Sequence, residues 1–238
     1  MKKSIIMLAA AAALFMFPSC EKVKGEGPLQ TETRAITNFT GVSASIGGKI
    51  NYKIDPVFKV EIIAQRNILD VIETSLVGGH LLVKVKNGVN IKSNEEITIN
   101  ISAPTADYLR LSGSGDLTVT GNVVATNLDL NISGSGSIVV PSVTVANKID
   151  AVISGSGSMS VLGGSAKNEE LRISGSGKFI VDAVAAENAI ITISGSGDAQ
   201  VKLSQTLDAS ISGSGSVYYR GNPLITTHIS GSGKVKPI

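Results

Sequence analysis

Serine is the most frequent residue in this sequence whose side chain could act as a nucleophile, and many of the serines alternate with glycine in a repeated motif. The tetrapeptide Ser-Gly-Ser-Gly begins at seven positions, which are Ser112, Ser133, Ser154, Ser174, Ser194, Ser212 and Ser230. A serine hydroxyl becomes a nucleophile when an imidazole base lies beside it. Glycine-rich loops can also hold phosphate groups through their backbone amides. The residues around the motifs decide between these chemistries.

Neither serine hydrolysis nor nucleotide binding is favoured by those surroundings. The chain has no G-x-S-x-G elbow, and its two histidines are His80 and His228. We expect His80 to lie in a turn after two glycines, and His228 to be a solvated strand residue. No motif continues as G-x-G-x-x-G, and no lysine that follows a motif precedes Ser or Thr, so the phosphate-binding patterns are absent.

Acidic residues lie four positions before four of the motifs, namely Asp129, Asp150, Glu170 and Asp208. If consecutive copies stack, the first three form an acidic strip. A carbohydrate-active enzyme similar to the β-helical polysaccharide lyases would use such carboxylates to hold a metal or move protons. The alternative is an outward-facing polar strand position, and the absence of Trp removes one platform for stacking sugars.

Calcium binding is the other chemistry that the acids suggest. Asp116 and Asp198 directly follow a motif, but Lys178 and Lys234 occupy the same position in two other copies. A repeated calcium site needs oxygen ligands in every copy. We therefore expect no metal, no cofactor and no catalytic residue, and we expect that the protein is not an enzyme.

The spacing of the motifs predicts the fold. The seven copies are separated by 21, 21, 20, 20, 18 and 18 residues, and apolar and polar residues alternate on both sides of each copy. Alternation with period two is typical of half-buried strands. A unit of 18–21 residues cannot bury its own apolar face, whereas stacked units can. The prediction is an all-β fold, a single-stranded β-solenoid with one coil per repeat; a β-sandwich is the alternative.

Two polar columns should run along such a stack. Counting by twos places both glycines of each motif on the inward side and both serines on the outward side, with either a bend or a tight corner between them. The serines would form a ladder of bonded hydroxyls or a recognition face. Upstream of the motifs, Asn127, Asn147, Asn168 and Asn188, with Gln205 in a similar place, would form an amide ladder or solvated loops.

The first 37 residues differ in composition from the rest. Lys2 and Lys3 precede 13 apolar residues, 5–17, which is the length of a secretory signal. The sole cysteine, Cys20, follows Phe17-Pro18-Ser19, a stretch that resembles a bacterial lipoprotein box. We predict a signal peptide at 1–19, lipid attachment at Cys20 and a polar tether over 20–37. Cleavage without lipidation is the alternative.

Charge and cysteine content exclude other classes. The chain has 21 Lys and Arg against 19 Asp and Glu, so removal of Lys2 and Lys3 leaves 19 against 19 and no net charge. Nucleic-acid binding proteins carry a basic stripe, and we expect no nucleic-acid partner. A single cysteine cannot form an intrachain disulfide.

Residues 38–108 lack the motif but alternate like strands at 57–63, 81–85 and 97–101. We expect one domain over 38–238, with irregular first coils at 38–108 and regular coils at 109–238; a separate small β domain over 38–108 is the alternative. The last motif lies close to Ile238, so the last coil would expose strand edges. Pairing of that edge with a second copy would form a homo-oligomer.

A family resemblance rests on several of these segments together. They are Phe39, Gly41-Val42, the stretches 62–74 and 81–83, and ITINISAP at 97–104, which leads into the Ser-Gly-Ser-Gly copies. Over residues 38–235 the chain resembles the bacterial putative auto-transporter adhesin, head GIN domain family. The resemblance implies a right-handed parallel β-helix and a secreted or lipid-anchored protein. It carries over no catalytic residue.

The resulting functional expectation is a non-enzymatic lipoprotein of the cell envelope. It would be exported, held in the outer membrane by a lipid on Cys20, and face the periplasm or the cell surface. It would act as an adhesin or binding module that presents its Ser/Gly face to a glycan or a protein. The alternatives are the carbohydrate-active enzyme and a structural or periplasmic partner-binding protein.

Overall fold

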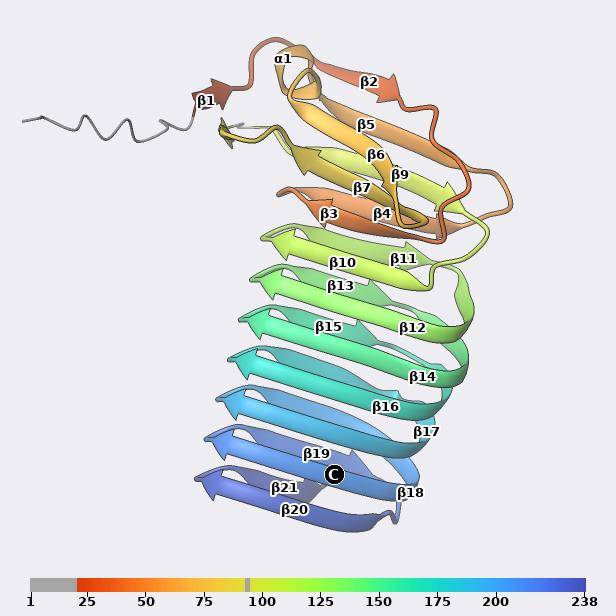
Figure 1. Cartoon of the computed structure of the whole chain (residues 1–238), viewed down its shortest axis with the longest axis vertical. Helices are drawn as coiled ribbons and strands as arrows, with labels where there is room; N and C mark the ends of the chain where they lie inside the picture. Colours follow the sequence, from red (N-terminus) through yellow and green to blue (C-terminus); the bar gives the residue numbers. More distant parts are fainter. Residues whose placement is uncertain (1–20, 93–94) are drawn as a thin grey trace, which may run out of the picture.

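The computed structural model describes residues 21–92 and 95–238. Figure 1 shows an elongated stack of β-coils with a more irregular cap at the N-terminal end. The described chain is nearly all strand, and its helix is the single turn α1 (Arg66–Leu69). The predicted signal peptide at 1–19 and Cys20 lie outside the described residues.

The regular part of the stack is a parallel β-solenoid. Its strands are β10 (Tyr108–Gly113), β11 (Asp116–Thr120), β12 (Asn122–Gly134), β13 (Ser137–Val140), β14 (Ser142–Gly155), β15 (Ser158–Val161), β16 (Gly164–Gly175), β17 (Lys178–Gly195), β18 (Asp198–Gly213), β19 (Ser216–Arg220), β20 (Leu224–Gly231) and β21 (Lys234–Pro237). Each pairs in parallel with the strand one repeat away, as β12 does with β14. The β-solenoid prediction is confirmed, and the β-sandwich alternative is wrong because sequential coils stack in parallel register.

The interior is filled by columns of matched apolar side chains. Leu130, Ala151, Leu171 and Ile191 follow one another up one column, and each is at most 1% exposed. In a second column the large Phe179 is paired in register with the small Ala199. Alternating large and small residues along a column keeps the packing dense, because each coil lies only ~4.8 Å from the next.

The Ser-Gly-Ser-Gly motif forms a tight corner between two faces of the solenoid. In every copy the first glycine has positive φ, between 113° and 132°, and turns away from the interior. The second glycine is the buried one in the copies from Gly115 to Gly215. The expectation that both glycines point inward is therefore wrong at the first, because a left-handed residue breaks the strand alternation.

The N-terminal cap continues the solenoid with mixed strand directions. It consists of β3 (Gly41–Ser45), β4 (Lys49–Ile54), β5 (Lys59–Gln65), α1, β6 (Ile72–Val77), β7 (His80–Val85), β8 (Val89–Lys92) and β9 (Thr98–Ala103). Strands β3 and β4 pair in parallel with β10 and β11. Strands β5, β6, β7 and β9 also form antiparallel pairs. One hydrogen-bonded network of strands therefore runs from the cap into the coils.

The segment expected to be a polar tether, 20–37, contains two strands among its described residues. Strand β1 (Glu21–Lys24) pairs in parallel with β8, and β2 (Leu29–Thr33) pairs antiparallel with β5. The Asn67 side chain joins this segment to α1: its Nδ2 donates to the Lys24 carbonyl at 2.6 Å, and its Oδ1 accepts from the Glu26 amide. The polar composition is compatible with these strands, because edge strands bond through their backbones and leave most side chains in solvent.

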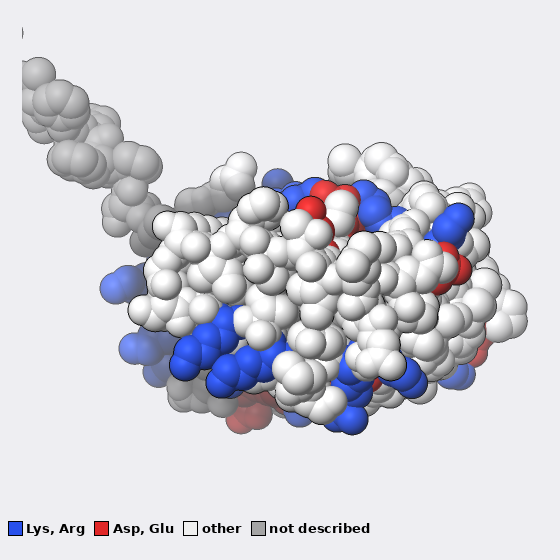
Figure 2. Space-filling view, turned by 90° about the horizontal axis from the view of Figure 1, so that it is seen from below, with Lys and Arg blue, Asp and Glu red and all other residues white. Residues whose placement is uncertain are grey.

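The last coil leaves two large apolar residues exposed within the described structure. Strand β20 pairs with β18 on one side, and Leu224 and Ile229 are 76% and 42% exposed. Figure 2 looks at this end of the molecule and shows a broad uncharged surface with Lys and Arg, and fewer Asp and Glu, around its rim.

Candidate functional site

One face of the solenoid carries three polar columns, and we call it the serine face. It is built by β10, β20 and the later halves of β12, β14, β16, β17 and β18. Alternate residues of these strands point outward, so residues four and two positions before each motif share the face with the first motif serine. The register places Asp129, Asp150 and Glu170 in one column, and Ser133, Ser154 and Ser174 in another.

The motif serines hold no hydroxyl ladder. Nearly all of them are exposed, and none of their hydroxyls makes a hydrogen bond to a residue that the structure describes. The corner is held by the backbone instead: the amides of Ser135 and Gly136 donate to the Gly113 carbonyl at 3.0 and 3.1 Å, and later copies repeat the pattern. The serine hydroxyls therefore keep their full capacity to donate and accept hydrogen bonds.

The acidic strip exists, but its middle is neutralised. Lys148 Nζ lies 2.9 Å from Asp150 Oδ2 and 2.8 Å from Glu170 Oε2, while Arg172 also bridges both carboxylates. Asp208 lies in the same column beyond Ile190, which separates it from Glu170. Carboxylates held by two cations are poorly placed to take a metal or a proton, so this geometry does not favour the lyase-like chemistry.

Asp129, at the cap end of the strip, is different. No described donor bonds to its carboxylate. Loss of hydration raises the pKa of Asp129, and the nearby Asp150 raises it further. Lys148 acts in the opposite direction but is bound to the other two acids. Asp129 is therefore a carboxylate without a cation of its own.

His80 and Tyr108 lie beside this carboxylate and form a small pocket. The two rings stack with their centroids 4.3 Å apart, and His80 Nδ1 lies 4.0 Å from Asp107 Oδ1. Both of these atoms are buried without a hydrogen-bond partner. We call the cavity, of about 370 Å³, the His80 pocket; its walls include His80, Thr105, Asp107, Tyr108, Asn127 and Asp129.

Sequence reasoning found part of this pocket. The repeat places Tyr108 and Asp129 in one column, and their register is observed. His80 is the first residue of β7 in the cap, and no periodicity could have placed its ring on Tyr108. The other histidine, His228, is exposed on β20 as expected.

The predicted amide ladder is present along the opposite end of these strands. Asn147 Nδ2 donates to Asn127 Oδ1 at 2.7 Å, and Asn188 Nδ2 donates to Asn168 Oδ1 at 3.2 Å. The next member is Thr206, whose hydroxyl donates to Asn188 Oδ1. Gln205 does not join the ladder but donates to Glu187, because register places Thr206 opposite Asn188.

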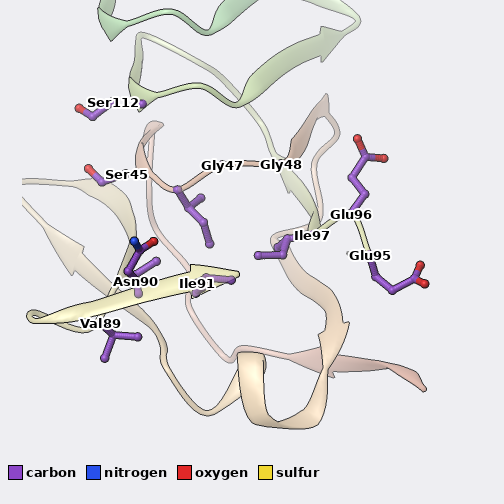
Figure 3. A pocket seen from close by; sticks show the side chains of 13 residues that line it. Ser45, Gly47, Gly48, Val89, Asn90, Ile91, Glu95, Glu96, Ile97 and Ser112 are labelled. Carbon is purple, nitrogen blue, oxygen red and sulfur yellow. The ribbon is translucent and has the colours of Figure 1, made fainter. Parts of the chain in front are cut away.

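A wider cleft of about 520 Å³ lies where the cap meets the first corner (Figure 3). Its wall includes Ser45 and Ser112, which follow paired residues of β3 and β10, so the serine column reaches the cleft. Ile97 points into it, whereas Glu95 and Glu96 point away from its centre. Glu96 is paired with Lys49 at 3.2 Å. The cleft thus joins an aliphatic floor to the serine column.

A carboxyl group inside the solenoid escaped sequence reasoning. Glu169 is 1% exposed, and neither of its oxygens has a hydrogen-bond partner. It stacks between Ile149 and Ala189 in an otherwise apolar column. Burial raises the pKa of Glu169 well above its usual range. Counting by twos back from Ile173 through Leu171 places Glu169 on the inward side, but its acidic side chain runs against the apolar pattern of that column.

Comparison with known proteins agrees with the architecture. The family model of the putative auto-transporter adhesin, head GIN domain matches residues 38–223. The chain belongs to this family. The family description names an adhesin, which indicates an extracellular or envelope-associated protein. No functionally curated protein matches the chain.

Several crystal structures share the family fold. A putative adhesin from Bacteroides fragilis is 23% identical, with a TM-score of 0.81, over 91% of this chain and 100% of that one. A putative lipid binding protein from Parabacteroides distasonis is 22% identical, with a TM-score of 0.75, over 92% and 100%. A putative adhesin from Parabacteroides merdae is 21% identical, with a TM-score of 0.72, over 92% and 99%. At these identities the likeness concerns the fold.

Within 21–92 and 95–238, no helix has the length and apolar character needed to cross a membrane. Lipid attachment at Cys20 concerns a residue outside the described ranges and stays a prediction.

Proposed function

We propose that this family member is a non-catalytic binding module of the cell envelope, anchored through a lipid on Cys20, that holds a glycan along its serine face. One observation carries the proposal: two serine columns repeat at every corner, and their exposed hydroxyls have no partner among the described residues. Hydroxyl groups repeated at ~4.8 Å suit a long polar ligand that makes the same contact many times.

The charge distribution favours a carbohydrate over a nucleic acid. The serine columns themselves are uncharged, and the mature chain has no net charge, with 19 basic and 19 acidic residues after removal of Lys2 and Lys3. Carbohydrate hydroxyls both donate and accept hydrogen bonds, as serine hydroxyls do. Weak contacts summed along several coils give avidity without a deep pocket.

The test is binding of residues 21–238 to immobilised polysaccharides. A triple variant, Ser154→Ala, Ser174→Ala and Ser194→Ala, removes hydroxyls from three consecutive corners, and we expect at least a tenfold loss of apparent affinity. The matched control replaces Ser158, Ser160 and Ser216 with Ala; their hydroxyls also make no hydrogen bond to a described residue, but they lie on β15 and β19. Equal binding by both triple variants would contradict the proposal.

The anchor is tested separately in cells. We expect the wild-type protein in the membrane fraction, labelled by a fatty-acid probe, and a Cys20→Ala variant that is unlabelled and released. Protease added to intact cells then distinguishes surface display from a periplasmic location. Protection until the outer membrane is broken would favour the periplasmic partner-binding alternative over adhesion.

A second candidate function follows from the cleft in Figure 3. Its floor includes Ile46, Ile91 and Ile97, and a structure with the same fold is described as a putative lipid binding protein. The cleft would hold the apolar end of an amphiphilic ligand. A fluorescent fatty acid should bind to the wild type and bind more weakly to Val89→Asp; equal binding by the two would remove this candidate.

A further inference from the structure

We propose that the His80 pocket is a binding site for an amine-bearing sugar, with Asp107 and Asp129 holding its ammonium group. This inference deepens the proposed function, on which it rests for the ligand class, and names the kind of glycan that the serine face would select.

No Lys or Arg is among the described residues that line the pocket. Along the strip and the pocket lie four carboxylates, Asp107, Asp129, Asp150 and Glu170. The lysine and arginine that face them are Lys148 and Arg172, and both are bound to Asp150 and Glu170. Asp107 and Asp129 are left with His80 as their neighbour of basic type, and its Nδ1 lies 4.0 Å from Asp107 Oδ1. A ligand ammonium group would neutralise these two carboxylates through charge-assisted hydrogen bonds.

The pocket also has unused hydrogen-bonding capacity. His80 Nδ1 and Asp107 Oδ1 are covered atoms of partly exposed side chains; they have no hydrogen-bond partner among the described residues and face each other at 4.0 Å, which is beyond hydrogen-bond distance. Buried polar groups normally find partners in a protein or in its ligand. Thr126 and the amide group of Asn127 add further polar groups to the wall.

Size and lining distinguish a sugar from a basic side chain. About 370 Å³ falls in the range of small-ligand sites. A Lys or Arg side chain needs apolar surface along its methylene stem. Among the described residues, this wall offers only Ala125 and the Tyr108 ring for that purpose. The remaining lining is polar, which suits a ring that carries hydroxyl groups around its ammonium.

The position of the pocket connects it to the serine face. Asp129 and Ser133 point to the same side of β12 and are four residues apart, which corresponds to about 13 Å of extended strand. A glycan that lies across the serine face therefore reaches the pocket within a few sugar units. The pocket sits at the cap end of the stack, so one ligand chain has one such site.

No three of the His, Cys, Asp and Glu residues in the described ranges group as metal ligands. The test nevertheless includes calcium alone as a competing explanation. The groups that face Asp129 are Asp107, Asp150, Lys148 and His80. Protonation of Asp129 removes a negative charge, so binding of a cation should weaken as the pH falls.

The experiment compares two tetrasaccharides by calorimetry near neutral pH, a glucosamine tetramer and its fully N-acetylated form. We expect the amine form to bind about tenfold or more tightly, and Asp129→Asn to abolish this preference. The matched control, Asp208→Asn, removes a carboxylate from the same column outside the pocket. This variant should keep the preference for the amine form. In addition, NMR should show the Asp129 pKa falling when the amine form binds.

The outcomes separate the two proposals. Equal affinity for the two tetramers would overturn the pocket assignment while leaving glycan binding intact. Binding of lysine amide or calcium as tight as that of the amine sugar, and equally sensitive to Asp129→Asn, would also overturn it. The Ser154, Ser174 and Ser194 triple variant should weaken binding of both tetramers and keep the preference for the amine form. Loss of affinity without loss of this preference would therefore be assigned to the serine face.

Discussion

The two glycines of each motif are required for different physical reasons. The first supplies positive φ, as at Gly195 with φ of 127°. The second needs space: a Cβ on Gly197 would lie 2.6 Å from both the Gly177 carbonyl oxygen and Ile173 Cγ2. Neither neighbour can move without shifting the coil below, because the coils are stacked through hydrogen bonds at that corner.

Gly197→Ala should therefore destabilise the fold by about 1–3 kcal/mol, the usual cost of overpacking a well-filled interior. Urea unfolding followed by circular dichroism measures the change. Gly163→Ala is the matched control, because its Cβ would meet no atom closer than 3.8 Å. A loss at Gly163 as large as that at Gly197 would show that the corner contact is not the cause.

Glu169 should be a destabilising residue. A buried polar group without a partner costs about 1–3 kcal/mol, and Glu169 has none for either oxygen. Glu169→Leu should raise the free energy of unfolding by about that amount. A decrease would mean that the carboxyl group has a stabilising partner in solution.

Glu169 also makes stability depend on pH in a defined direction. Burial raises its pKa in the folded state, so the folded protein keeps a proton that the unfolded chain has already lost. The contribution of Glu169 to the free energy of unfolding is most favourable below the ordinary glutamate pKa. It is lost as the pH rises toward the raised pKa of the folded state. The free energy of unfolding, measured across this pH range, should fall less for Glu169→Gln than for the wild type. Parallel curves of unfolding free energy against pH would contradict the assignment.

At the scale of elements, the amide ladder stabilises the corner opposite the serines. Asn168 donates to the Asn147 carbonyl at 3.2 Å and accepts from Asn188. Asn168→Ala removes both bonds and should cost about 1–2 kcal/mol. Gln200→Ala serves as the control, because it removes an amide that makes no side-chain hydrogen bond within the described chain. Equal losses would show that the ladder adds nothing.

The folded state of the N-terminal segment has a proteolytic signature. The Arg34 guanidinium contacts Glu32 and donates to the Leu69 carbonyl, so the chain there is held against the cap. Trypsin should spare Arg34 until the whole domain unfolds, whereas a flexible tether would be cut there at once. Mass spectrometry of a digestion time course with residues 21–238 decides, with cleavage in urea as the control.

At the scale of the whole molecule, each coil contacts mainly its neighbours, so one coil should be dispensable. Deletion of residues 154–173 joins Ile153 to Ser174 and leaves the remaining columns in register. The shortened chain should keep parallel-β circular dichroism and cooperative unfolding, as expected when stability is a sum of neighbouring interfaces. Deletion of residues 154–163 removes half a coil and should abolish folding; equal behaviour would contradict a repeat-by-repeat stack.

Self-association stays a prediction for the last coil, where Leu224 and Ile229 are exposed beside the unpaired edge of β20. Light scattering of residues 21–238 should detect a species larger than the monomer, and Ile229→Lys should remove it. A wild-type protein that is monomeric at high concentration would contradict this prediction.

The sequence by itself determined the repeat, the strand alternation and the stacking of equivalent residues. A period of 18–21 residues and a two-residue alternation are local properties, and they place Asp129, Asp150 and Glu170 in one column without any coordinates. The asparagine ladder followed from the same logic, although the register selected Thr206 rather than Gln205 as its last member.

Only the tertiary structure decided what those columns meet. Backbone angle turned the first glycine of each motif outward, so the motif is a corner and its serines are free. Lys148 and Arg172 neutralise the middle of the acidic strip. The His80 ring stacks on Tyr108 and comes from the cap, which follows no repeat. These contacts join residues far apart in sequence, and their geometry depends on packing between elements, which periodicity does not encode.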